Sequence, residues 1–159
     1  MITVNAMTDK QRMAIATHVA SFSEDPDTQV GCVVIAADGA ILSTGANRPA
    51  RGVRVKQAPE RLLRPAKYQW IEHAERDAIA AAARRGVALQ GATMYLPWFP
   101  CAACANSIVN VGIDALVCYK PSADSAVTRS DDPWNFAIAT AILSEGGVDV
   151  RYIDKEPSA

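Results

Sequence analysis

Residues 29–46 read Gln-Val-Gly-Cys-Val-Val-Ile-Ala-Ala-Asp-Gly-Ala-Ile-Leu-Ser-Thr-Gly-Ala, and they indicate the class of structure. The first half, residues 29–37, is a nearly continuous apolar run rich in β-branched side chains. Such a run predicts a central strand that is buried on both faces. Asp38-Gly39 is typical of a tight hairpin turn, and residues 40–46 then return as an antiparallel strand. We therefore expect a sheet with helices on both of its faces.

Helices and strands alternate on either side of this hairpin. Upstream, Thr8 is expected to cap a helix over residues 9–22, with Gln11 completing a capping box. Downstream, the patterns predict an irregular basic segment over 47–69, a helix over 72–85, a strand over 93–96, a helix over 102–111, a strand over 115–119, a polar loop over 120–132, a helix from Pro133 to Gly146-Gly147 and a strand over 148–153. The order α-β-β-α-β-α-β-α-β, with right-handed crossovers, predicts a three-layer α/β/α fold with a mixed five-stranded sheet.

The overall composition is that of an ordinary globular protein. The chain has 159 residues and a formal charge of -1, and 50% of its residues are hydrophobic. We therefore expect residues 1–159 to form a single domain with a full core. The balanced charge gives no global field that would favour nucleic acid or a membrane surface. Because no apolar run approaches the roughly 18 residues of a membrane span and no signal-peptide pattern is present, we expect a cytoplasmic protein.

Two short motifs carry the chemistry. His73-Ala74-Glu75 opens one predicted helix, and Pro100-Cys101-Ala102-Ala103-Cys104 opens the next. One histidine and two cysteines are three ligands that suit a tetrahedral zinc ion, with the fourth position left to water. Glu75 follows the histidine by two residues, close enough to exchange protons with that water without binding the metal. The two motifs together predict a hydrolytic zinc centre.

Other interpretations of these residues exist. A Cys-x-x-Cys pair alone is also found in redox sites and structural zinc sites, and Glu75 could be a simple helix N-terminal acid. Structural zinc normally has four protein ligands. Cys32 and Cys118 lie within predicted strands and are interpreted as core residues, while His18 lies within a predicted helix beside apolar positions. Since no fourth ligand is evident, we favour an open, catalytic zinc site.

The motifs also resemble a known family. H-x-E followed by P-C-x-x-C is the signature of zinc-dependent nucleoside and nucleobase deaminases. Residues 24–32, Glu-Asp-Pro-Asp-Thr-Gln-Val-Gly-Cys, resemble the S-K-D-P-x-x-Q-V-G-A stretch of deoxycytidylate deaminases, and residues 67–75 are similar to their K-Y-x-x-x-x-H-A-E. Residues 92–113 follow the third strand and third helix of these enzymes. By this resemblance the chain is identified as a member of the cytidine and deoxycytidylate deaminase superfamily.

The resemblance implies a cytidine-deaminase-like fold and a zinc-dependent hydrolase of pyrimidine metabolism. His73, Cys101 and Cys104 would bind Zn²⁺, and Glu75 would be the catalytic proton shuttle. Asn47 matches an asparagine that contacts the nucleotide in this family. The residues that we expect at the substrate are Asn47, Ala74, Trp98, Phe99 and Pro100. Trp98 and Phe99 could wall a flat heterocycle, although Phe99 could equally pack in the core, which makes Trp98 the better pocket candidate. Since family members are usually oligomeric, a homo-oligomer of two to six chains is expected.

The substrate itself stays open at this point. Two positions that are basic in the family's R-S-K-D-P pattern hold Phe22 and Glu24, which would bind a phosphate poorly. A basic loop could replace those contacts, but it could equally be solvated or form an oligomer contact. Binding of single-stranded nucleic acid is disfavoured, because few aromatic residues lie near this loop. The basic residues of the loop are Arg48, Arg51, Arg54, Lys56, Arg61, Arg64 and Lys67.

We expect deamination of dCMP to dUMP and ammonia. The alternative within the enzyme class is an unphosphorylated nucleoside, a free base or another amino-heterocycle. The alternative outside it is a catalytically silent oligomeric domain that binds zinc or a nucleotide.

Overall fold

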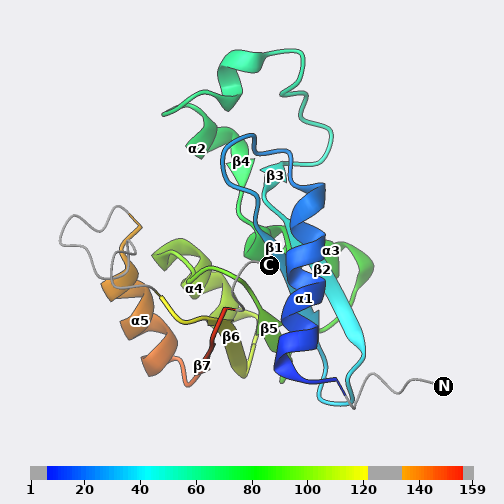
Figure 1. Ribbon diagram of the computed structural model, residues 1–159, viewed down its shortest axis with the longest axis vertical. Coiled ribbons are helices and arrows are strands. Elements are labelled where there is room, and N and C mark those ends of the chain that lie inside the picture. Colours follow the sequence, from blue (N-terminus) through cyan, green and yellow to red (C-terminus); the bar gives the residue numbers. More distant parts are fainter. Residues whose placement is uncertain (1–6, 122–133, 156–159) are drawn as a thin grey trace.

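A mixed five-stranded sheet forms the centre of the computed structural model, which describes residues 7–121 and 134–155. The strands are β1 (Gly31–Ile35), β2 (Ile41–Ala46), β5 (Thr93–Tyr95), β6 (Ala115–Tyr119) and β7 (Asp149–Ile153). Their order in the sheet is β2-β1-β5-β6-β7, shown in Figure 1. β1 is buried at every position and pairs antiparallel with both β2 and β5, while β5, β6 and β7 run parallel. The predicted mixed sheet is confirmed.

Helices cover both faces of this sheet. They are α1 (Asp9–Val19), α3 (Ala74–Arg85), α4 (Ala102–Asn110) and α5 (Phe136–Glu145). Along β1, Val33 and Ile35 pack in one cluster with α1, whereas Cys32 and Val34 pack in another cluster with α3, α4 and α5. The three-layer prediction is thus confirmed. None of the helices in the described part of the chain is long and apolar enough to cross a membrane.

Several element boundaries differ from the prediction. The N-terminal helix has the predicted capping box of Thr8 and Gln11, but its α-helical part ends at Val19 and continues as a 3-10 turn, η2 (Ala20–Phe22). α3 begins at Ala74, because His73 before it has an extended backbone. The predicted strands are each shortened at one or both ends, except the one over 115–119. Pro133 and most of the predicted loop over 120–132 lie outside the described residues, and α5 begins at Phe136.

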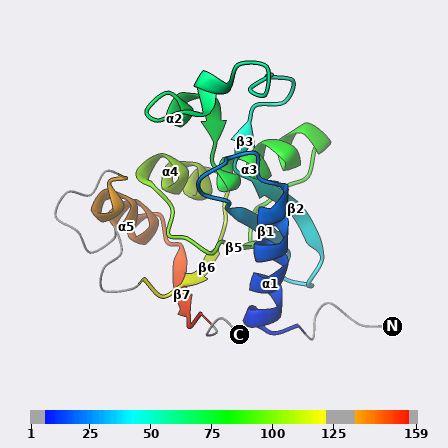
Figure 2. The ribbon, with the colours of Figure 1, turned by 45° about the horizontal axis from the view of Figure 1, so that its top comes forward.

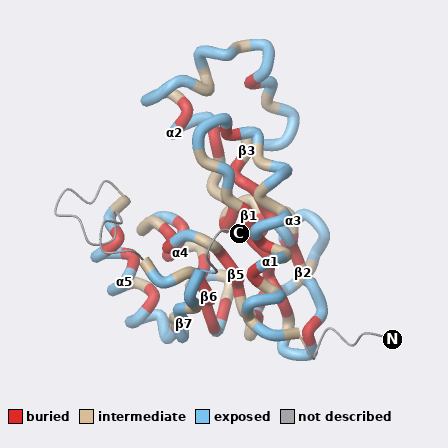
Figure 3. The backbone as a smooth tube through the Cα atoms, viewed as in Figure 1, coloured by how far each residue is buried: buried red, intermediate tan, exposed pale blue. Residues whose placement is uncertain are grey.

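The prediction of an irregular segment over 47–69 is wrong in part. This segment holds β3 (Arg48–Pro49), the 3-10 turn η3 (Pro59–Leu62) and the one-turn helix α2 (Lys67–Trp70), and β4 (Ile71–Glu72) follows. β3 and β4 pair antiparallel and form a separate two-stranded sheet. We call residues 50–70, between these two strands, the arm. Figures 1 and 2 show the arm projecting from the end of the main sheet, and Figure 3 shows most of it exposed.

Close packing of α3 on β2 fixes the position of the metal-site helix. A Cβ atom on Gly45 would lie 2.2 Å from the backbone oxygen of Ala74 and 2.3 Å from the backbone nitrogen of Ala78. Only glycine allows the helix backbone to approach the strand this closely. Since Ala74 lies between His73 and Glu75, this contact fixes the position of both residues at the end of the sheet.

Candidate metal centre and active-site pocket

Three candidate ligands converge where two helices begin. His73 is the N-cap residue of α3, Cys101 is the N-cap residue of α4, and Cys104 lies in the first turn of α4. The Nδ1 atom of His73 lies 3.5 Å from the Sγ atom of Cys101 and 3.4 Å from the Sγ atom of Cys104. All three donor atoms lie within 4.8 Å of one another. The structure therefore places the three predicted ligands together.

This arrangement fits a zinc ion. Bond lengths of about 2.3 Å to sulfur and about 2.0–2.1 Å to nitrogen place neighbouring ligands of a tetrahedral zinc about 3.5 Å apart. The observed nitrogen–sulfur distances match that separation. Within residues 7–121 and 134–155, no other group of three such side chains is gathered in this way. Cys32 and Cys118 are fully buried in the core, and His18 is exposed on α1, so they add no fourth ligand.

The charges at the site favour a bound cation. The pKa of Cys101 lies well below the usual thiol range, chiefly because of its hydrogen bond with Cys104 and also because of His73. The pKa of Cys104 is raised by the same hydrogen bond and by burial. A metal ion bound between the two sulfur atoms would stabilise both of them as thiolates. Burial also raises the pKa of Glu75.

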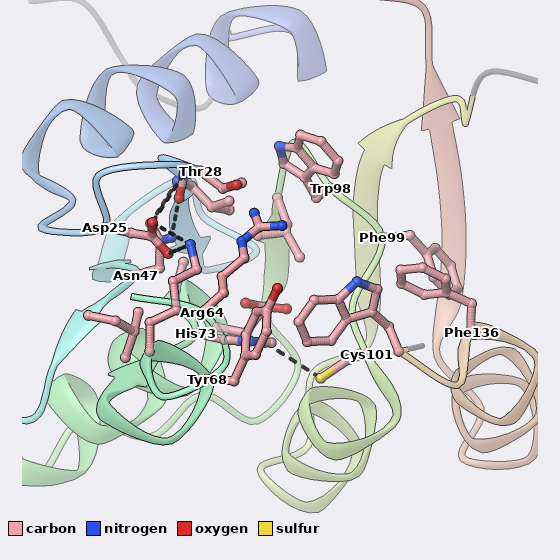
Figure 4. Close-up of a pocket in the computed structure, with 17 residues that line it drawn as sticks. Asp25, Thr28, Asn47, Arg64, Tyr68, His73, Trp98, Phe99, Cys101 and Phe136 are labelled. Carbon is pink, nitrogen blue, oxygen red and sulfur yellow. Dashed lines mark hydrogen bonds and ion pairs between the residues drawn. The ribbon is translucent and has the colours of Figure 1, made fainter. Parts of the chain in front are cut away.

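A pocket of about 610 Å³ opens beside these ligands. His73, Glu75 and Cys101 line it, together with Asn47 and Ala74. Aromatic side chains form much of its wall, as Figure 4 shows for those that it labels, and they are Tyr68, Trp98, Phe99, Trp134 and Phe136. Of the residues expected to contact the substrate, Pro100 alone is buried without lining the pocket.

Trp134 is a pocket residue that the sequence analysis missed. Its ring centroid lies 5.7 Å from that of His73 and 5.4 Å from that of Tyr68, edge to face in both pairs. Its backbone oxygen accepts a hydrogen bond from the Ala102 amide at the start of α4. Trp134 comes directly after a long polar segment without periodicity, so no local pattern indicated that it would reach the metal ligands.

The side chain of Asn47 organises the neighbouring loop. Its Oδ1 atom accepts hydrogen bonds from the Ser23 hydroxyl and the Val30 amide, at 2.6 and 2.7 Å. Its Nδ2 atom donates to the backbone oxygen of Thr28. One N–H of the amide is left over to meet a ligand in the pocket. Asn47 therefore stabilises the loop beside the pocket, and its own side chain also lines the pocket.

A buried ion pair joins the arm to this same loop. The Nζ atom of Lys67 lies 2.8 Å from Oδ1 of Asp25 and 2.9 Å from Oδ2 of Asp27. The side chains of Lys67 and Asp25 are only 3% and 7% exposed. Burial alone would lower the pKa of Lys67, but the two carboxylates outweigh it and leave that pKa raised. Lys67 was predicted only as one of the basic residues of a loop, so its burial against Asp25 and Asp27 is a finding of the structure.

Replacing Lys67 with Met is expected to destabilise the protein by about 3–5 kcal/mol, because Asp25 would stay buried without its counter-ion. The free energy of unfolding in urea measures this change. Lys56→Met is the matched control, since Lys56 and its partner Glu24 lie 3.9 Å apart with side chains 78% and 36% exposed. Its cost should stay below about 1 kcal/mol. Equal costs for both variants would contradict the structural role given to Lys67.

The same ion pair has a pH dependence. The hydrogen bond from Lys67 is the largest cause of a lowered pKa at Asp27. The contribution of Asp27 to stability is therefore present above the ordinary value of 3.8. It is lost as the pH falls through the lower value of the folded state.

Comparison with known proteins gives consistent matches. A family model described as the cytidine and deoxycytidylate deaminase zinc-binding region matches residues 6–120. A protein of Aliivibrio fischeri named "Uncharacterized deaminase in luxG 3'region" is 31% identical over 144 residues, which cover 91% of this chain and 92% of that protein. The deoxycytidylate deaminase of Pongo abelii is 32% identical over 109 residues, which cover 66% of this chain. The chain thus spans only 60% of the length of that mammalian relative.

A solved structure shares the fold. The dCMP deaminase of cyanophage S-TIM5, in complex with dCMP and dUMP, superposes with a TM-score of 0.69. The match covers 91% of this chain and 95% of the phage chain at 19% sequence identity. This likeness confirms the expected cytidine-deaminase-like fold.

Proposed function

The chain belongs to the cytidine and deoxycytidylate deaminase family, a family of zinc-dependent hydrolases, and we propose that it converts dCMP to dUMP and ammonia. The observation that carries this proposal is the presence of Glu75 in the same pocket as the zinc ligands His73 and Cys101. A buried carboxylate beside a three-ligand metal centre is the arrangement needed to replace an exocyclic amine by oxygen.

The proposed reaction adds water to the ring carbon that carries the amine. When bound, the zinc ion supplies a Lewis acid that makes water nucleophilic near neutral pH. Glu75 takes one proton from the attacking water and passes it to the adjacent ring nitrogen. It then takes the second proton from the new hydroxyl group and passes it to the departing amine, which leaves as ammonia. Burial raises the pKa of Glu75, and a carboxyl group whose pKa lies nearer to neutral is better suited to carry protons.

The aromatic wall of the pocket supports a flat ring as the substrate. Trp134 lies edge to face with both His73 and Tyr68, and Trp98 lines the pocket with its side chain largely exposed. Such side chains exclude water around a heterocycle and offer faces on which it can stack. We propose that Asn47, Ala74, Trp98 and Phe99 contact the substrate, while Pro100 supports the turn that leads to Cys101.

A specific observation favours an unphosphorylated amino-heterocycle as the second candidate. Phe22 is exposed, Glu24 pairs with Lys56 at 3.9 Å, and neither residue lines the pocket. The positions that are basic in the family's pattern thus offer no charge to a phosphate. A nucleoside or free base would need no such charge.

Ammonia release by the zinc-loaded protein tests the proposal. The substrates are dCMP, CMP, deoxycytidine, cytidine, cytosine and a set of aminated purines and triazines. We expect kcat/KM for dCMP to exceed that for deoxycytidine by about 10- to 100-fold, the size of a charge-assisted hydrogen-bond contribution. Turnover confined to unphosphorylated rings would contradict dCMP as the substrate and support the second candidate. No ammonia from any of these substrates would contradict both candidates.

We also propose that residues 1–159 act as one deaminase domain that assembles into a homo-oligomer of two to six chains. Large apolar side chains exposed on the arm and on α5 are candidates for contacts between chains, and they are Leu63, Trp70 and Ile138.

A further inference from the structure

Two basic residues of the arm line the pocket, and they differ in what they can still bind. Of the seven basic residues predicted in this loop, only Arg64 and Lys67 line the pocket. Both stand on the side of the pocket formed by the arm and by the loop that contains Asp25 and Thr28. Among the described residues that line the pocket, Arg64 and Lys67 are the lysine and arginine side chains, so they and that loop are the first candidates to bind an anionic group on the substrate.

Lys67 and the loop are already occupied. The Nζ atom of Lys67 lies within 3.0 Å of both carboxylate oxygens of Asp25 and 2.9 Å from Oδ2 of Asp27. Backbone amides of a loop can also cradle an anion, but here Oδ1 of Asp25 accepts the amides of Asp27 and Thr28, at 2.8 and 3.2 Å. The ammonium group of Lys67 and the backbone amides of Asp27 and Thr28 are thus already paired with carboxylates of the protein.

In the part of the chain that the structure describes, Arg64 hydrogen-bonds to the protein through only one side of its guanidinium group, the side that carries Nε. Its Nε atom lies 3.3 Å from Oδ2 of Asp27, and its guanidinium carbon lies 5.8 Å from the centre of the Tyr68 ring. Within residues 7–121 and 134–155, its terminal nitrogens Nη1 and Nη2 donate no hydrogen bond to another residue. Its side chain is 59% exposed, and Figure 4 shows it reaching from the arm into the pocket. Asp27 and Tyr68 therefore orient the guanidinium and leave its terminal nitrogens for a ligand.

We propose that Arg64 binds the 5′-phosphate of the substrate and makes the enzyme prefer a nucleotide to a nucleoside. This inference rests on the proposed function. A guanidinium offers two parallel N–H donors that match two phosphate oxygens, which an ammonium group cannot do. Because Oδ2 of Asp27 is shared with Lys67, Arg64 is only partly neutralised by its protein neighbour. A phosphate group would supply the negative charge that neutralises the rest of the Arg64 charge.

Arg64→Gln tests the proposal with two matched substrates. We expect kcat/KM for dCMP to fall about 10- to 100-fold, mainly through a higher KM, because a charge-assisted contact is lost. The value for deoxycytidine should stay within about twofold, because the nucleoside has no phosphate to lose contact with. Arg51→Gln is the control, since Arg51 lies in the same arm, is exposed and does not line the pocket. It removes the same charge and should leave both values unchanged.

Product binding gives a second measurement that does not depend on turnover. Calorimetry of the zinc-loaded protein should show that wild type binds dUMP more tightly than deoxyuridine, and that Arg64→Gln loses this preference. Equal melting temperatures and zinc contents for both proteins establish that the variant is folded. A folded Arg64→Gln variant that keeps the wild-type preference for dCMP and dUMP would overturn the inference and leave the proposed function standing. Wild-type protein that releases no ammonia from dCMP would instead overturn the proposed function.

Discussion

Replacement of Glu75 with Gln is expected to lower kcat on dCMP by about 10²–10⁴-fold, the contribution of a positioned general acid–base group. The glutamine side chain would have nearly the same shape but could neither take a proton from water nor pass one to the ring or to the amine. The zinc content should stay near that of wild type, because Glu75 is not one of the three converging ligands. Ammonia release and metal analysis on the same preparation measure the two effects.

Glu145→Gln is the matched control for this experiment. Glu145 is exposed at the last residue of α5, so the same chemical change there should leave kcat and zinc content unchanged. Unchanged turnover in the Glu75→Gln variant would refute the proton-transfer role given to this residue. Loss of zinc together with turnover would show that Glu75 supports the metal site and would contradict its assignment as a proton shuttle alone.

Replacement of Cys101 with Ser is expected to remove zinc and to destabilise the fold. The two N-cap residues, His73 and Cys101, belong to different helices, so a bound metal ties α3 to α4. Free zinc at about a thousand times its dissociation constant stabilises the folded state by about 4 kcal/mol. Wild-type protein should therefore show a lower melting temperature after treatment with a chelator. Cys101→Ser should begin at the lower temperature and show no further shift.

Cys118→Ala separates the metal effect from loss of a buried thiol. Cys118 is fully buried in β6 and lies outside the ligand group. Its replacement should cost stability through packing, while the zinc content and the chelator-induced shift remain. A Cys101→Ser variant that keeps one zinc per chain and the full chelator shift would refute the assigned ligand set.

The parts of the fold that the sequence predicted well depend on local signals. The capping box of Thr8 and Gln11, the Asp38-Gly39 turn and the end of α3 at Arg85 each involve residues that lie within a few positions of one another. The metal ligands were predictable for a similar reason, because each motif opens a helix and both helices begin at one end of the sheet. Short-range chemistry combined with a simple topology was sufficient there.

The features that were missed depend on contacts between distant segments. Lys67 and Asp25 are 42 positions apart, and a lysine in a basic loop carries no local sign that it will be buried. β3 and β4 are two residues each, too short for any alternating pattern, and they pair only because the ends of the arm meet. The role of Asn47 likewise depends on three partners 17 to 24 positions away.

The pocket is built from two separable parts, with consequences for how such an enzyme can diversify. The hydrolytic centre stands on helix ends that are locked onto the sheet, with α3 pressed against Gly45. Part of the remaining wall belongs to the arm, which ion pairs join to the Asp25–Thr28 loop. Exchanging the arm between related chains would thus transfer substrate selectivity and leave the hydrolytic centre unchanged. Substitutions in the arm can thus change which substrate is bound while the metal ligands and Glu75 stay the same.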